Sequence, residues 1–267
     1  MSGRVRDALL ATGYWDEVWS SDILPSETPA VTLIAGENRL AVPPHEGLAA
    51  PEARHYQGDV RDLFDPEHPV NRIRFADLQC NYLAPEDGLW DLAVLHPPCT
   101  HLTLGGARYW KQKRATPAPW RPEGWPEDEV FSVQDEAAAF FVECLNAPAR
   151  YVGVENPRGD MTRRGYPPTQ YVQPWWFGDD VEKATGWWLK GLPPLVADNP
   201  VVPAGRVTTG GGSHRTDMRK NGRSNNGHED SEGRARRHIV RSRTLPGMAR
   251  AVAAQWTRFC EEQETAP

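Results

Sequence analysis

The sequence predicts an α/β protein built on a doubly wound, mostly parallel β-sheet, with a small irregular basic lobe. A strand, a helix and a second strand are expected in succession at 92–95, 133–145 and 151–157. Alternating strands and helices are typical of parallel sheets whose crossover helices cover the faces. With 267 residues, 39% of them hydrophobic, the chain has enough apolar side chains for a large core.

Composition indicates the cellular location of the protein and argues against several classes of protein. No apolar run approaches the roughly 18 residues that a membrane span needs, and the N-terminus lacks the charged-then-apolar pattern of an export signal. We therefore expect a cytoplasmic protein that does not contact membranes. The four cysteines show no CxxC pairing, which argues against a disulfide framework and against a structural zinc site.

The first elements suggest a ligand-binding turn. Apolar spacing predicts a helix over 3–12 and a strand over 18–24. Ser2 and Gly3 lie at the mouth of the helix, where free backbone N–H groups face a ligand. Asp22, near the end of the strand, is suited to accept hydrogen bonds from ribose hydroxyls.

A long connection separates this strand from the next. The region 29–53 is rich in Pro, Ala and Glu and is expected to be an insertion, with one strand over 31–35. A further strand then ends at Gly58 and Asp59. Asp59 or Asp77 is suited to contact an adenine amino group, and an ordinary role in a turn is equally consistent with either residue.

The central stretch contains a candidate nucleophile. The apolar strand 92–95 stops at Pro97 and Pro98, which cannot donate the hydrogen bonds that would extend it. Cys99 therefore follows the carboxyl end of a strand, the edge at which open parallel sheets bind ligands. The alternative for this residue is an inert buried cysteine in a proline-rich turn.

A second strand with a polar residue near its end favours Cys99 as a nucleophile over Cys99 as an inert cysteine. The strand 151–157 contains Glu155 and is expected to lie parallel to the strand before Cys99. Adjacent parallel strands bring both residues to one edge. A carboxylic acid beside a thiol is suited to attacking an aromatic ring while protonating it. In the intervening helix, Cys144 lies on the apolar stripe and is expected in the core.

The last third of the chain combines aromatic and basic segments. The stretches 173–179 and 183–189 are rich in Trp, which suits either stacking on flipped bases or an ordinary core. Between Arg206 and Arg243 there are ten Arg or Lys against four Asp or Glu, a local charge of +6 in a chain of net charge −6. This composition is typical of a polyanion-binding loop or of a solvated insertion. A final helix follows, with Thr244 expected as its N-cap.

Together these motifs resemble DNA cytosine-5 methyltransferases, and most closely the compact phage and prophage proteins of that class. Pro97-Pro98-Cys99 and Glu155-Asn156-Pro157 are similar to the Pro-Cys and Glu-Asn-Val motifs of the family. In all, eight similar segments follow the order of the family and span nearly the whole chain; they begin at Ser2, Ser21, Tyr56, His96, Glu155, Gln173, Lys183 and Arg241.

The resemblance implies a Rossmann-like methyltransferase fold and S-adenosylmethionine as the cofactor. Cys99 would add to carbon 6 of a cytosine flipped from duplex DNA, while Glu155 engages ring nitrogen 3, with Arg241 or Arg243 assisting Glu155 or binding phosphate. The implied cofactor-binding residues are Ser2, Gly3, Val5, Asp22, Gly58, Asp59 and Pro97. The residues expected to bind DNA are Arg215, Arg219, Lys220, Arg234, Arg236 and Arg237. The protein is expected to act as a monomer, in a bacterial or phage-infected cell.

Three domain segments follow from this resemblance. We expect a catalytic core over 1–200, a flexible basic segment over 201–240 that recognises the target, and a C-terminal helix over 241–267 that closes the core. In the family a strand precedes the Ser-Gly turn, whereas Met1 stands immediately before it in this sequence, so the first strand is expected to be missing.

Two other functions are compatible with the sequence. The first is a degenerate methyltransferase fold that binds DNA or protein, which the missing first strand favours. The second is a zinc-dependent hydrolase or deaminase with His96, Cys99 and His101 as ligands.

Overall fold

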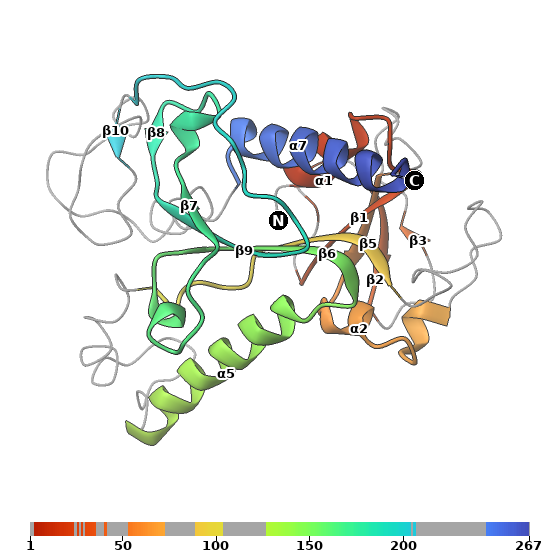
Figure 1. Cartoon of the computed structure of the whole chain (residues 1–267). Helices are drawn as coiled ribbons and strands as arrows, with labels where there is room; N and C mark the ends of the chain where they lie inside the picture. The colour runs from red at the N-terminus through yellow and green to blue at the C-terminus, as the bar shows by residue number, and fades with distance from the viewer. Residues whose placement is uncertain are drawn as a thin grey trace, which may run out of the picture. The chain divides into compact units, whose positions relative to one another are not determined.

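The protein has a mixed α/β architecture (Figure 1). A computed structural model describes residues 3–23, 26, 28, 30–35, 40–41, 53–72, 89–103, 127–203, 205–206 and 244–266. The chain divides into two compact units. Unit 1 consists of Met1–Asp91, Phe177–Asp179 and Ser224–Pro267, and unit 2 consists of Leu92–Trp176 and Asp180–Arg223.

The sheet of unit 1 contains the parallel strands that the sequence predicts. Its strand order is β1 (Val18–Asp22), β4 (Ala53–Gln57), β2 (Val31–Ile34) and β3 (Leu40–Ala41). Strand β4 pairs in parallel with β1 and with β2, and β3 is antiparallel to β2. Strands β1, β2 and β4 confirm the strands expected near these positions. A buried cluster beside them consists of Leu33, Tyr56, Leu63 and Val70.

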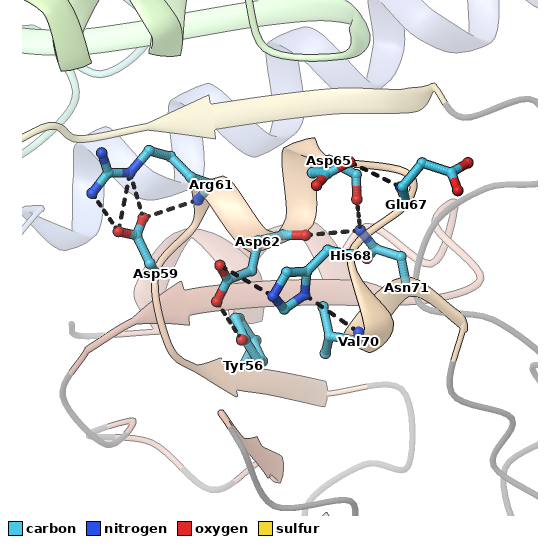
Figure 2. A network of polar contacts seen from close by, with 9 residues as sticks. All are labelled: Tyr56, Asp59, Arg61, Asp62, Asp65, Glu67, His68, Val70 and Asn71. Carbon is cyan, nitrogen blue, oxygen red and sulfur yellow. Dashed lines mark hydrogen bonds and ion pairs between the residues drawn. The ribbon is translucent and has the colours of Figure 1, made fainter.

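Polar contacts shape the chain after β4. Helix α2 (Arg61–Phe64) and the 3-10 turn η1 (Pro69–Arg72) follow this strand. The buried Tyr56 hydroxyl donates to Asp62 Oδ2 at 2.6 Å, and the Asn71 amide donates to the Asp62 carbonyl at 2.8 Å (Figure 2). These hydrogen bonds tie both short helical turns to the end of β4.

Two helices of unit 1 pack against each other. Helix α1 (Arg4–Leu10) confirms the predicted N-terminal helix, and it lies beside α7 (Pro246–Glu264) in Figure 1. The N-cap of α7 is Leu245, so the expectation of Thr244 as the cap is wrong. The carboxylate of Asp179 caps the helix instead, because it accepts hydrogen bonds from the backbone N–H groups of Gly247 and Met248, each at 3.0 Å.

The main sheet of unit 2 differs from the mostly parallel sheet that the sequence predicts. Its strand order is β5 (Trp90–Leu95), β6 (Ala149–Pro157), β9 (Thr185–Lys190) and β7 (Gln170–Val172). Strand β9 is antiparallel to both β6 and β7. The chain reaches β9 from β6 without an α-helix, and an α-helix is the usual connection between parallel strands.

Helix α5 (Glu127–Leu145) precedes β6, as expected, and Cys144 is buried on it. Phe141 of α5 meets Trp188 of β9 edge to face, with ring centroids 4.9 Å apart. Trp187 and Trp188 are both buried, so these two aromatic residues belong to the core of unit 2. The short strands β8 (Val181–Glu182) and β10 (Gly205–Arg206) pair in parallel. None of the described helices has both the length and the apolarity needed to cross a membrane.

Candidate active site

Cys99 follows β5 in a loop that its own backbone helps to form. Strand β5 ends at Leu95, and the Cys99 carbonyl accepts hydrogen bonds from the backbone N–H groups of Leu102 and Thr103, both at 3.0 Å. Cys99 is half-buried, and its thiol is free. The residues of β5 are half-buried or exposed rather than fully buried, because β5 is the outermost strand of its sheet within the described residues.

The ends of β5 and β6 lie together. The buried Asn156 side chain, which is 2% exposed, donates from Nδ2 to the Pro97 carbonyl at 2.9 Å. One residue earlier in each segment, His96 Nδ1, in the loop after β5, lies 3.1 Å from Oε2 of Glu155 in β6. These contacts agree with the expectation that both strands end at one edge. They also hold the Pro-Pro segment before Cys99 against β6.

The Glu155 carboxylate has a partner on each oxygen. His96 meets Oε2, and Thr185, the first residue of β9, donates its hydroxyl to Oε1 at 2.9 Å. Burial by itself raises the pKa of Glu155. The hydrogen bond from His96, the charges of Lys183 and His96 and the hydrogen bond from Thr185 together lower it to about 2. Glu155 is therefore ionised at neutral pH.

The pKa of the Cys99 thiol is shifted in the opposite direction, upward. Burial raises the pKa of Cys99, and the negative charge of Glu155 raises it further, while the positive charge of Lys183 opposes both effects. The resting site therefore holds a thiol and a carboxylate. A thiol becomes a nucleophile when it loses its proton, and a carboxylate is a base that can take one.

A glycine after β6 supports the Cys99 loop and was not predicted. Gly159 forms an isolated antiparallel bridge with Thr103, and the backbone N–H of Asp160 donates to the Leu102 carbonyl at 2.6 Å. A Cβ atom on Gly159 would overlap the Leu102 carbonyl, so only glycine permits this approach. A Gly-Asp pair soon after Glu155 was the available signal.

Several residues expected to bind the cofactor lie in unit 1. Gly3 precedes α1 with φ at 62°, a left-handed conformation that favours glycine, and Val5 is half-buried in α1. Asp22 ends β1, and its carbonyl accepts a hydrogen bond from the Gly58 backbone N–H at 3.0 Å. The structure therefore places Asp22 and Gly58 side by side at the carboxyl edge of the parallel strands.

Asp59 lies one residue further along and has a close partner of its own. Arg61 donates to Asp59 from its backbone N–H at 3.0 Å and from its guanidinium, with Nη2 2.5 Å from Oδ2. The hydrogen bond from Arg61 lowers the pKa of Asp59 although burial opposes this effect. Glycine beside carboxylates at this edge suits a nucleoside with ribose hydroxyls and an amino group.

The remaining predicted residues lie outside the part of the chain that the structure describes. They are Ser2, Asp77, Arg241, Arg243 and the six residues expected to bind DNA, namely Arg215, Arg219, Lys220, Arg234, Arg236 and Arg237. Within the described part, no group of three His, Cys, Asp or Glu is placed to hold a metal ion. His96, which the sequence offered only as a zinc ligand, instead directs Nδ1 to Glu155.

Comparisons with protein-family models, with curated proteins and with solved structures find no match to this chain. A proposal for the function therefore rests on the residues of the candidate site and their chemistry.

Proposed function

We propose that this protein transfers a methyl group from S-adenosylmethionine to carbon 5 of cytosine in DNA, on a Rossmann-like methyltransferase fold. The observation that supports the proposal most directly is the pairing of Cys99 with Glu155 at the ends of neighbouring strands. Their pKa values move apart, that of the thiol upward and that of the carboxylate downward. Pairs of titratable groups whose pKa values are shifted in opposite directions are typical of acid–base pairs in active sites.

The proposed chemistry uses both groups in one proton transfer. The proton of the Cys99 thiol passes to the Glu155 carboxylate, and the sulfur forms a bond to carbon 6 of cytosine. Glu155 then gives this proton to ring nitrogen 3, so the electron pair of the carbon 5–carbon 6 double bond becomes available at carbon 5. S-adenosylmethionine, when bound, supplies the methyl group that carbon 5 takes. A base later removes the proton from carbon 5, and the sulfur leaves carbon 6. The proton on ring nitrogen 3 returns through Glu155 to the sulfur, which restores the thiol and the carboxylate.

The proposed cofactor residues within unit 1 are Gly3, Val5, Asp22, Gly58 and Asp59. Asp22 would bind ribose hydroxyls. Asp59 would have to share its carboxylate between Arg61 and an adenine amino group. Arg241, Arg243 and the basic residues before them remain proposed contacts to DNA, because phosphates attract such clusters whatever the base sequence.

Covalent trapping tests the proposal. DNA carrying 5-fluorocytosine should remain attached to the protein in the presence of S-adenosylmethionine, because fluorine on carbon 5 cannot leave as a proton does. Cys99→Ser should form no such complex, whereas Cys144→Ser, which changes a buried cysteine of α5, should trap DNA like the wild type.

The proposal is wrong if Cys99→Ser traps as much DNA as the wild type, or if the wild type traps none. In the second case, calorimetry separates the alternatives. A protein that binds DNA without binding S-adenosylmethionine would be a binding module on a degenerate fold. Stoichiometric zinc in the purified protein would instead favour a hydrolase or deaminase.

A further inference from the structure

The carboxylate of Glu155 is held from two directions by residues that are distant in sequence. His96 reaches Oε2 from the loop after β5, and Thr185 reaches Oε1 from the start of β9. The side chains of His96 and Glu155 are 13% and 16% exposed, so their contact is mostly shielded from water. A carboxylate gripped at both oxygens keeps one orientation, and each oxygen retains a further lone pair for another partner.

The state of Glu155 determines the tautomer of His96. An ionised carboxylate only accepts hydrogen bonds, so Nδ1 of His96 must carry the hydrogen that lies between the two residues. The imidazole ring also packs against the buried Trp187 at 72°, with centroids 6.0 Å apart. Its Nε2 atom is buried and has no hydrogen-bond partner among the described residues. The contact between Nδ1 and Glu155 therefore fixes the orientation of the imidazole ring.

We infer that His96 is the positioning residue of Glu155: its Nδ1–H group holds the carboxylate ionised and aimed for proton transfer from Cys99. This role rests on the proposed function, because it concerns the same reaction. Besides His96, Lys183 and Thr185 also favour the ionised form of Glu155, and the charge of Glu155 acts in turn on the Cys99 thiol. Without the Nδ1 donor, burial would oppose the ionised form of Glu155 more strongly, and Oε2 would lose the contact that fixes its direction.

Two substitutions separate the Nδ1 hydrogen bond from the rest of the side chain. In His96→Asn the side-chain amide nitrogen occupies nearly the position of Nδ1 and can still donate to Glu155. In His96→Gln the amide lies nearer the position of Nε2 and cannot. We expect His96→Gln to lower the rate of tritium release from carbon 5 of cytosine by about 10- to 100-fold, the effect of losing a hydrogen bond to a charged group. His96→Asn should remain within about threefold of the wild type.

A titration without DNA separates the failure of this inference from the failure of the proposed function. The ¹³C signal of the Glu155 carboxyl group, assigned by its loss in Glu155→Gln, should titrate at a pH higher by about one unit or more in His96→Gln. It should move less in Thr185→Val, because His96 lowers the pKa of Glu155 more than Thr185 does. Thr185→Val and His96→Asn also provide the comparison if His96→Gln does not fold.

An unchanged titration in His96→Gln, or equal rates in the Asn and Gln variants, would overturn the inference. If the titration moves as expected while wild-type protein traps no DNA, His96 still positions Glu155, and it is the proposed methyl transfer that fails.

Discussion

Unit 1 and unit 2 each contain an acidic side chain near the end of a strand, and the two are held in different ways. Asp59 of unit 1 is 39% exposed and pairs with Arg61, its neighbour two residues later. Glu155 of unit 2 is 16% exposed and meets His96, a residue 59 positions away. Both carboxyl groups have lowered pKa values. Water screens the exposed pair of Asp59 and Arg61 strongly, and it screens the mostly buried pair of Glu155 and His96 only weakly. The two pairs should therefore contribute unequally to the free energy of unfolding.

The largest difference between Glu155 and Asp59 should appear in the free energy of unfolding at low pH. The folded-state pKa of Glu155, about 2, lies below its ordinary value of 4.5, so its contribution to stability is present above pH 4.5 and is lost as the pH falls toward 2. Between about pH 6 and pH 3, the wild type should lose roughly 2 kcal/mol more of its free energy of unfolding than Glu155→Gln does. Urea unfolding at each pH measures this difference.

Asp59→Asn is the matched control for this measurement. Its pH dependence should follow that of the wild type closely, because an exposed ion pair contributes little to the free energy of unfolding. If both variants flatten the pH dependence equally, then burial does not distinguish the two acids.

The second comparison uses two asparagines of unit 2. Asn156 donates to the Pro97 carbonyl while buried, and Asn146 donates to the Val142 carbonyl while exposed, both at 2.9 Å. Asn156→Ala leaves a buried carbonyl without its donor and should cost about 1.5 kcal/mol in the free energy of unfolding. Asn146→Ala should cost less than about 0.5 kcal/mol, since water replaces its amide. Equal losses in urea unfolding would show that the Pro97 contact is not a buried anchor.

The smallest effect is expected at the ion pair of unit 1, drawn in Figure 2. Arg61→Ala should change the free energy of unfolding by less than about 1 kcal/mol, and high salt should reduce even this difference. Urea unfolding in about 0.1 M and about 1 M NaCl provides the measurement. A large loss that persists in high salt would place Asp59 in the same class as Glu155 and remove the contrast between the units.

Local patterns predicted most of the described elements around the candidate site. Helical spacing located α1 and α5, and short apolar runs located β1, β5 and β6. The expected parallel sheet is correct for β1, β4 and β2, but β9 runs antiparallel to β6. Strand direction depends on how the chain returns to the sheet, and the aromatic segments before β9 contain no periodic signal for that path.

The candidate site shows the same limit at the level of single residues. Cys99 and Glu155 were identified because each stands near the end of a recognisable strand. The donors Thr185 and His96, and the close approach at Gly159, were missed because these contacts join separate segments of the chain. Their sequence neighbourhoods resemble those of ordinary polar or turn residues.

The sequence alone therefore identified Cys99 and Glu155 as candidate site residues and placed each near the end of a strand. Residue type and local periodicity are enough for that, because backbone geometry decides where a short apolar run ends. Only the tertiary structure decided that Glu155 is ionised, that Cys99 rests as a thiol and that His96 bears hydrogen on Nδ1. These states depend on burial and on polar and charged groups from the loop after β5, from β6 and from the segment around the start of β9, which come together only when the chain is folded.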